Sequence, residues 1–146
     1  MSLLNTIQTA IEVVGDMDPF QFMKLHNIHL MDLPLMSCEG VIKIDDRDST
    51  IIIQKGLSDK RKLFVLWHEI GHFLLDYKLG KYLFKNIKNP SYSERRANIF
   101  ACLKVLKVDK LKESTKQELI DNGCPDNIAD DFLNFAHDLI VETKTI

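Results

Sequence analysis

Residues 63–76 constrain the fold more than any other part of this 146-residue chain. When they are placed at helical spacing, their apolar side chains cover nearly the whole circumference and leave only a narrow polar strip. That strip holds His68, Glu69, His72 and Asp76. A helix that is apolar on almost every side is typical of a protein interior, so we expect it to be buried.

The buried polar strip contains the pattern His-Glu-x-x-His. Histidines four residues apart lie one turn apart on the same face of a helix, so the imidazoles of His68 and His72 can reach one metal ion, with Glu69 beside it. The alternative is that both are core histidines bonded to backbone carbonyl groups. Buried imidazoles need polar partners, and one metal ion would satisfy both. The pattern therefore favours a metal site of the kind found in zinc hydrolases.

A second helix is predicted from Ser91 to about Lys107, with Glu94 at the head of its inward face. Ala97 and Ala101 on that face would allow a close approach to another helix. Such an approach would bring Glu94 within reach of the two histidines. Ser91 and Glu94 also fit a capping box, in which the glutamate bonds the backbone amide at the start of the helix. The spacing leaves these two alternatives open.

The other predicted elements suit an α+β fold with a small, mostly antiparallel sheet, and no linker or repeat divides residues 1–146 into more than one domain. Asp18 and Ser58 are predicted to cap two helices. Basic residues 78–90 are predicted to form a connector. The remaining predicted helices are Leu3–Val14, a short helix that opens at Asp18-Pro19 and stops near Asn27, Leu111–Ile120 and Ile128–Val141. The predicted strands are Ile28–Met31, Val41–Ile44 and Thr50–Gln54.

Composition excludes several classes of protein. A net charge of −2 without a dense basic run gives no electrostatic case for direct nucleic-acid binding. The sequence shows neither a membrane span nor a secretory leader, so we expect a cytoplasmic protein without a membrane partner. Cys38, Cys102 and Cys124 form no Cys-x-x-Cys pair, and we expect them to be reduced thiols.

Two motifs together resemble the ImmA/IrrE family of metallopeptidases. The first is FxxxHEIGHFLL at residues 64–75, and the second is ExxANxFA at residues 94–101. The resemblance is clear over residues 56–103 and weaker in the C-terminal helices. Family members often have Met-Pro after the second motif, whereas this chain has Leu-Lys-Val-Asp at residues 106–109. That difference concerns the wall of the substrate cleft and leaves the metal site unaffected.

The resemblance implies a zincin-like metallopeptidase core with the His-Glu-x-x-His helix at its centre. It implies that His68, His72 and Glu94 are zinc ligands and that Glu69 is the catalytic base. Three protein ligands would leave a fourth tetrahedral position for water, which is the arrangement of a catalytic zinc site. Asp76 is either a residue that orients an imidazole or a surface carboxylate.

A residue that stabilises the oxyanion is less well defined by the sequence. Tyr77 and Tyr92 are the candidates. Their spacing does not choose between them, and packing is the commoner role for each.

Members of the family cleave helix-turn-helix repressors of phages and mobile elements or regulators of stress responses. The resemblance therefore implies a zinc endopeptidase that acts on such a protein substrate. The alternative from another class is a metal-binding anti-repressor that binds its partner without cleaving it. The presence of Glu69 favours the enzyme, because binding alone does not require a base at that position.

Overall fold

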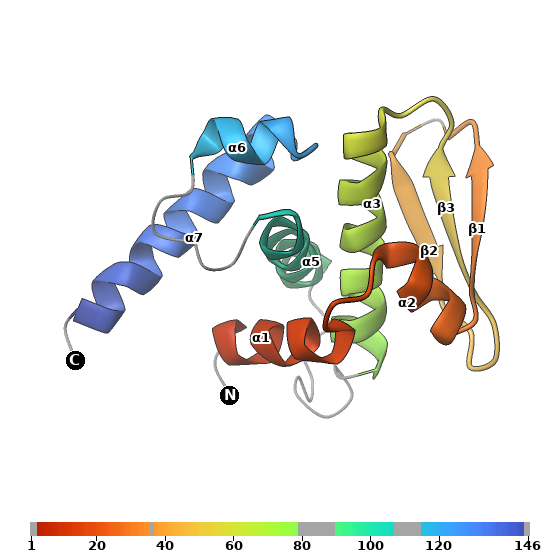
Figure 1. Ribbon diagram of the computed structural model, residues 1–146, viewed down its shortest axis with the longest axis horizontal. Helices are drawn as coiled ribbons and strands as arrows, with labels where there is room; N and C mark the ends of the chain where they lie inside the picture. The colour runs from red at the N-terminus through yellow and green to blue at the C-terminus, as the bar shows by residue number, and fades with distance from the viewer. Residues whose placement is uncertain (1–2, 36, 79–89, 107–114, 145–146) are drawn as a thin grey trace.

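The computed structural model describes residues 3–35, 37–78, 90–106 and 115–144. Within these ranges, helices and one small sheet form the α+β fold that the sequence predicts. Figure 1 shows α3 (Asp59–His72) in the middle of the molecule. The sheet lies on one side of α3, and α1, α5, α6 and α7 lie on the other.

The two N-terminal helices form where the sequence predicts them, and the second ends at Leu25, close to the predicted stop near Asn27. α1 (Leu3–Val14) buries its apolar face, and the chain leaves it at Gly15, where φ is 59°. α2 (Pro19–Leu25) begins after Asp18, whose carboxylate accepts a 2.8 Å hydrogen bond from the backbone of Gln21. The backbone N–H of Asp18 in turn donates a 2.9 Å hydrogen bond to Oε1 of Gln21, which completes a capping box.

The sheet is mixed, so the prediction of a mostly antiparallel sheet is wrong. Its strands β1 (Ile28–Leu33), β2 (Gly40–Lys43) and β3 (Ser49–Gln54) lie in the order β1-β3-β2. β2 and β3 form an antiparallel hairpin, and β1 pairs with the other edge of β3 in parallel. Three consecutive isoleucines, residues 51–53, suit a central strand, and two of them are completely or almost completely buried. The β-prone runs in the sequence identified the strands, but they carried no information about which strand edges would pair.

α3 is capped and buried as predicted. The Ser58 hydroxyl accepts a 3.2 Å hydrogen bond from the backbone of Arg61. After His72 the chain continues in a π-helix, η1 (Phe73–Lys78), which the sequence pattern did not predict. The α3 side chains in the core are Phe64, Val65, Leu66, Trp67 and Ile70.

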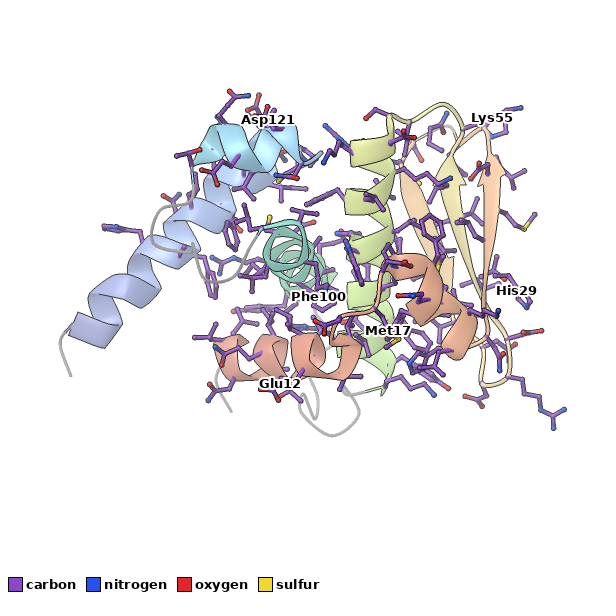
Figure 2. All side chains as sticks on the ribbon, viewed as in Figure 1. Glu12, Met17, His29, Lys55, Phe100 and Asp121 are labelled. Carbon is purple, nitrogen blue, oxygen red and sulfur yellow. The ribbon has the colours of Figure 1, made fainter. Side chains whose placement is uncertain are left out.

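α5 (Pro90–Val105) packs directly against α3. Ala97 and Ala101 are fully buried, as expected of small residues at a close helix contact. A Cβ atom on Gly71 of α3 would lie 3.0 Å from Cδ1 of Phe100 and 3.2 Å from Cα of Ala97. Figure 2 shows Phe100 between the two helices. The predicted close approach of the two helices is therefore confirmed, and it takes place one residue before His72.

We expect Gly71→Val to lower the free energy of unfolding by about 3 kcal/mol, because a branched side chain overpacks this contact. Thermal unfolding of the metal-free protein, followed by circular dichroism, measures the loss. Glu12→Val, at an exposed position on α1, is the control and should have little effect. A Gly71→Val protein as stable as the control would show that the contact between α3 and α5 can relax without cost.

The C-terminal helices α6 (Lys116–Asp121) and α7 (Asp126–Lys144) are joined by a turn at Gly123, where φ is 95°. A Cβ atom there would lie 2.3 Å from the carbonyl oxygen of Lys60, so the turn packs tightly on the start of α3. Most of the predicted connector and residues 111–114 of the predicted helix 111–120 lie outside the described residues. The prediction of a helix through residue 115 is wrong, because Thr115 has extended backbone and caps α6, with its hydroxyl accepting a 3.2 Å hydrogen bond from the backbone of Glu118. The three cysteines are free, and the sulfur atoms of Cys102 and Cys124 are 3.8 Å apart.

Candidate metal centre

α3 places His68, Glu69 and His72 within about one helical turn of one another, and His68 and Glu69 line a cleft. The Nε2 atoms of the two histidines are 3.1 Å apart, and their rings are nearly perpendicular, at 85°. The histidine side chains are only 15% and 11% exposed. Both imidazoles therefore point toward one location that is largely screened from solvent.

Glu94 reaches the same location from α5. Its Oε1 atom lies 2.9 Å from Nε2 of His72, and its Oε2 atom lies 3.3 Å from Nε2 of His68. The capping-box alternative does not fit this geometry, because α5 already begins at Pro90 and Ser91 falls inside the helix. The carboxylate is directed at the two histidines, and hydrogen bonding from His68 lowers its pKa.

The three side chains form a suitable donor set for a metal ion. One ligand atom from each of His68, His72 and Glu94 can be chosen so that all lie within 4.8 Å of one another. Two imidazole nitrogens and one carboxylate oxygen are the donors of many catalytic zinc sites. The residues expected from the sequence to surround a metal are thus brought together by the packing of α5 against α3.

Asp76, from η1, contacts Nδ1 of His72, whereas the other ring nitrogen, Nε2, faces Glu94. The Oδ2 atom of Asp76 accepts a 2.7 Å hydrogen bond from Nδ1 of His72. Since an ionised carboxylate only accepts hydrogen bonds, Nδ1 of His72 carries a proton, and Nε2 is the ring nitrogen that would bind a metal. Of the two roles that the sequence left open for Asp76, the geometry favours orientation of His72.

The charges around this pair suit that role. Burial acts to raise the pKa of Asp76, but hydrogen bonds from His72, Ser93 and Arg96 outweigh it and keep the pKa below its usual value. Burial acts to lower the pKa of His72, but the bond to Asp76 and nearby carboxylates raise it overall. These shifts favour the charged form of Asp76 and make the His72 imidazole more basic than usual.

Glu69 occupies a different environment from Glu94. It is 5% exposed, and its Oε1 atom lies 4.0 Å from Nε2 of His68, too far for a hydrogen bond. Burial raises the pKa of its carboxyl group. A carboxylate that is reluctant to stay charged is a better proton acceptor near neutral pH.

The cleft beside these residues has a volume of about 360 Å³. One wall is formed by the start of β2, where a Cβ atom on Gly40 would lie 3.3 Å from Oε1 of Glu69. The opposite wall includes Asn98 of α5, whose buried Oδ1 atom has no hydrogen-bond partner among the described residues. Pro125 and the start of α7, through Asn127 and Ile128, also line the cleft.

Neither tyrosine candidate lines the described part of the cleft. The Tyr77 hydroxyl donates a 2.6 Å hydrogen bond to Asp46, and Tyr92 is 56% exposed on α5. Ser93 and Arg96, which contact Asp76, were not predicted from the sequence. They could have been identified by their position in the same helical turn as Glu94, where the charged Arg96 directly precedes the buried Ala97.

A family model described as the IrrE N-terminal-like domain matches residues 23–132. This range includes the sheet, α3, α5 and the start of α7. The chain belongs to this family of metallopeptidases. No curated protein and no solved structure matched the chain. Among the described residues, no helix combines the length and apolar character needed to cross a membrane.

Proposed function

We propose that the chain is a zinc-dependent endopeptidase with a zincin-like core. The observation that carries this proposal is the convergence of His68, His72 and Glu94 on one location, with Glu69 buried beside it. In this proposal the first three residues hold zinc, and Glu69 is the base. Membership of a peptidase family supports catalysis over binding alone.

Zinc at this centre would supply Lewis-acid chemistry, which lowers the pKa of water and polarises a carbonyl group. Glu69 then accepts the proton of the attacking water and passes it to the leaving amine. His72 keeps its orientation through its bond to Asp76. The low exposure of the histidines and of Glu69 strengthens the electrostatic interactions among these side chains.

The position of β2 supports an extended protein substrate. β2 is an edge strand, and its first residue, Gly40, lies against the Glu69 side chain. A substrate segment that adds to an edge strand is held by main-chain hydrogen bonds, which do not depend on its sequence. Such binding selects for an exposed and flexible segment, for example an interdomain linker or a terminal tail.

The proposed substrate is a helix-turn-helix transcriptional repressor of a phage or mobile element, or a stress-response regulator. This part of the proposal rests on the resemblance to the ImmA/IrrE family. A net charge of −2 agrees with a protein that acts on a repressor without binding DNA itself. The reaction would take place in the cytoplasm, where such repressors act.

Co-expression with a repressor encoded beside the gene tests this function. Intact repressor is measured by immunoblot with the wild-type protein and with Glu69→Gln. We expect the wild type to cut the repressor at one site and Glu69→Gln to leave it intact. Denatured casein, added to the purified protein, is the control for general proteolysis and should be cut poorly.

The alternative function predicts a different pattern. If the repressor stays intact with both proteins and its DNA binding is relieved equally by both, the chain is an anti-repressor that acts by binding. Rapid cleavage of casein would instead contradict the proposed substrate while leaving the peptidase assignment in place.

A further inference from the structure

Arg96 is a buried charged residue close to the candidate metal centre. It is 4% exposed and lies on α5, two residues after Glu94. A buried guanidinium group is costly unless opposite charge and hydrogen bonds compensate for its lost hydration. Its Nη2 atom donates a 2.9 Å hydrogen bond to Oδ1 of Asp76, which belongs to η1. The bond therefore links α5, which carries Glu94, to η1, which carries the Asp76 carboxylate that contacts His72.

Asp76 uses its two oxygen atoms for different partners. Oδ1 accepts from Arg96, whereas Oδ2 accepts from Nδ1 of His72 at 2.7 Å. The Ser93 hydroxyl also donates to Oδ2, and it lies 3.1 Å from Nδ1 of His72. Two residues of α5 thus fix the carboxylate that orients a histidine of α3.

We propose that Arg96, assisted by Ser93, is a positioning residue for the metal centre and acts on His72 through Asp76. The inference rests on the proposed function, because it assumes that His72 binds a metal ion. Its physical basis is that a carboxylate held at both oxygens cannot rotate, so the ring that it holds keeps Nε2 aimed at the site. In this proposal α5 supplies one ligand, Glu94, and also carries Arg96, which supports a second ligand, His72.

A purely structural role for Arg96 makes a different prediction. A buried salt bridge that only stabilises the fold would affect unfolding but not the affinity for zinc once the protein is folded. A positioning role changes zinc affinity, and the change depends on Asp76. The two roles are separated by measuring zinc affinity in folded protein and by combining substitutions at the two positions.

The experiment measures the zinc dissociation constant by competition with a chromophoric chelator. We expect Arg96→Met and Asp76→Asn each to weaken zinc binding by about 10–100-fold, the usual effect of losing a residue that supports a metal ligand. The double variant should be about as weak as Asp76→Asn alone. Arg95→Met is the matched control, because Arg95 bonds Asp131 of α7 at 3.1 Å and should not affect zinc binding.

A second readout does not involve zinc. In ¹⁵N-histidine spectra of the metal-free protein, the wild type should show one sharp signal for the Nδ1–H group of His72 that is hydrogen-bonded to Asp76. Arg96→Met should broaden or shift that signal because the carboxylate is no longer fixed, whereas Arg95→Met should match the wild type. If Arg96→Met does not fold, Ser93→Ala removes another donor to Asp76 and should weaken zinc binding in the same direction.

Three results would overturn the inference. The first is wild-type zinc affinity in Arg96→Met, or in Ser93→Ala if that variant is the one tested. The second is an additive loss in the double variant, because it would mean that Arg96 acts independently of Asp76. The third is a wild-type protein that binds no zinc, which would remove the proposed function as well. The first two results leave the proposed function standing, so the two failures can be distinguished.

Discussion

Glu69→Gln is expected to lower kcat by about 10²–10⁴-fold while the protein keeps its fold and its zinc. The amide has nearly the same shape as the carboxylate but cannot accept the proton of the attacking water. The side chain is 5% exposed and lies beyond hydrogen-bond distance of His68, so the substitution should leave the proposed ligands in place. Cleavage of the purified repressor and zinc content are measured on the same preparation.

Glu39→Gln is the matched control for this result. Glu39 is another carboxylate that lines the cleft, where it is bonded to Arg61 at 2.9 Å. Its removal should leave kcat close to the wild-type value, because it is not among the residues around the candidate metal centre. Wild-type kcat in Glu69→Gln would show that Glu69 is not the base. A loss of zinc in that variant would instead show that Glu69 contributes to metal binding.

The second large effect is expected from removal of the proposed ligands. Wild-type protein should carry about one zinc ion per chain, because His68, His72 and Glu94 provide three donors suited to it. The double substitution His68→Ala, His72→Ala should abolish zinc binding. Glu94→Ala should weaken it by at least about 100-fold, which exceeds the usual effect of losing a supporting residue. Metal analysis and titration with zinc measure these losses.

His29→Ala controls for nonspecific binding by histidine. His29 is bonded to Asp48 on an exposed part of the sheet, well away from α3 in Figure 2, and its removal should leave zinc content unchanged. A capping role for Glu94 would make Glu94→Ala cost about 1 kcal/mol of stability with unchanged zinc. Equal zinc binding by Glu94→Ala and wild type would therefore refute the proposed ligand set.

Local patterns in the sequence were sufficient to predict most helices and the caps at the start of two of them. The caps at Asp18 and Ser58 formed as expected, because a short polar side chain before an apolar periodic run satisfies the free amides of the first turn. Periodicity also showed which faces turn inward, including the small residues Ala97 and Ala101. These features depend on residues within a few turns of one another, which is why sequence alone could give them.

Local sequence patterns could not predict how the strands pair or where α3 ends. Alternating side chains distinguish the two faces of a strand but not its neighbours, and so the parallel pairing of β1 with β3 was missed. The change from α-helix to π-helix after His72 was missed for a similar reason. The apolar residues that follow fit either helix, and only packing against the core selects one.

The sequence by itself determined that this protein has a buried helix carrying two histidines and a glutamate at metal-binding spacing. Only the tertiary structure decided that the Glu94 carboxylate faces those histidines and does not cap its helix, and that Asp76 is held by Arg96. The reason is physical. Spacing along one helix fixes directions within that helix, whereas the distance between α3 and α5 depends on the contact between Gly71 and Ala97.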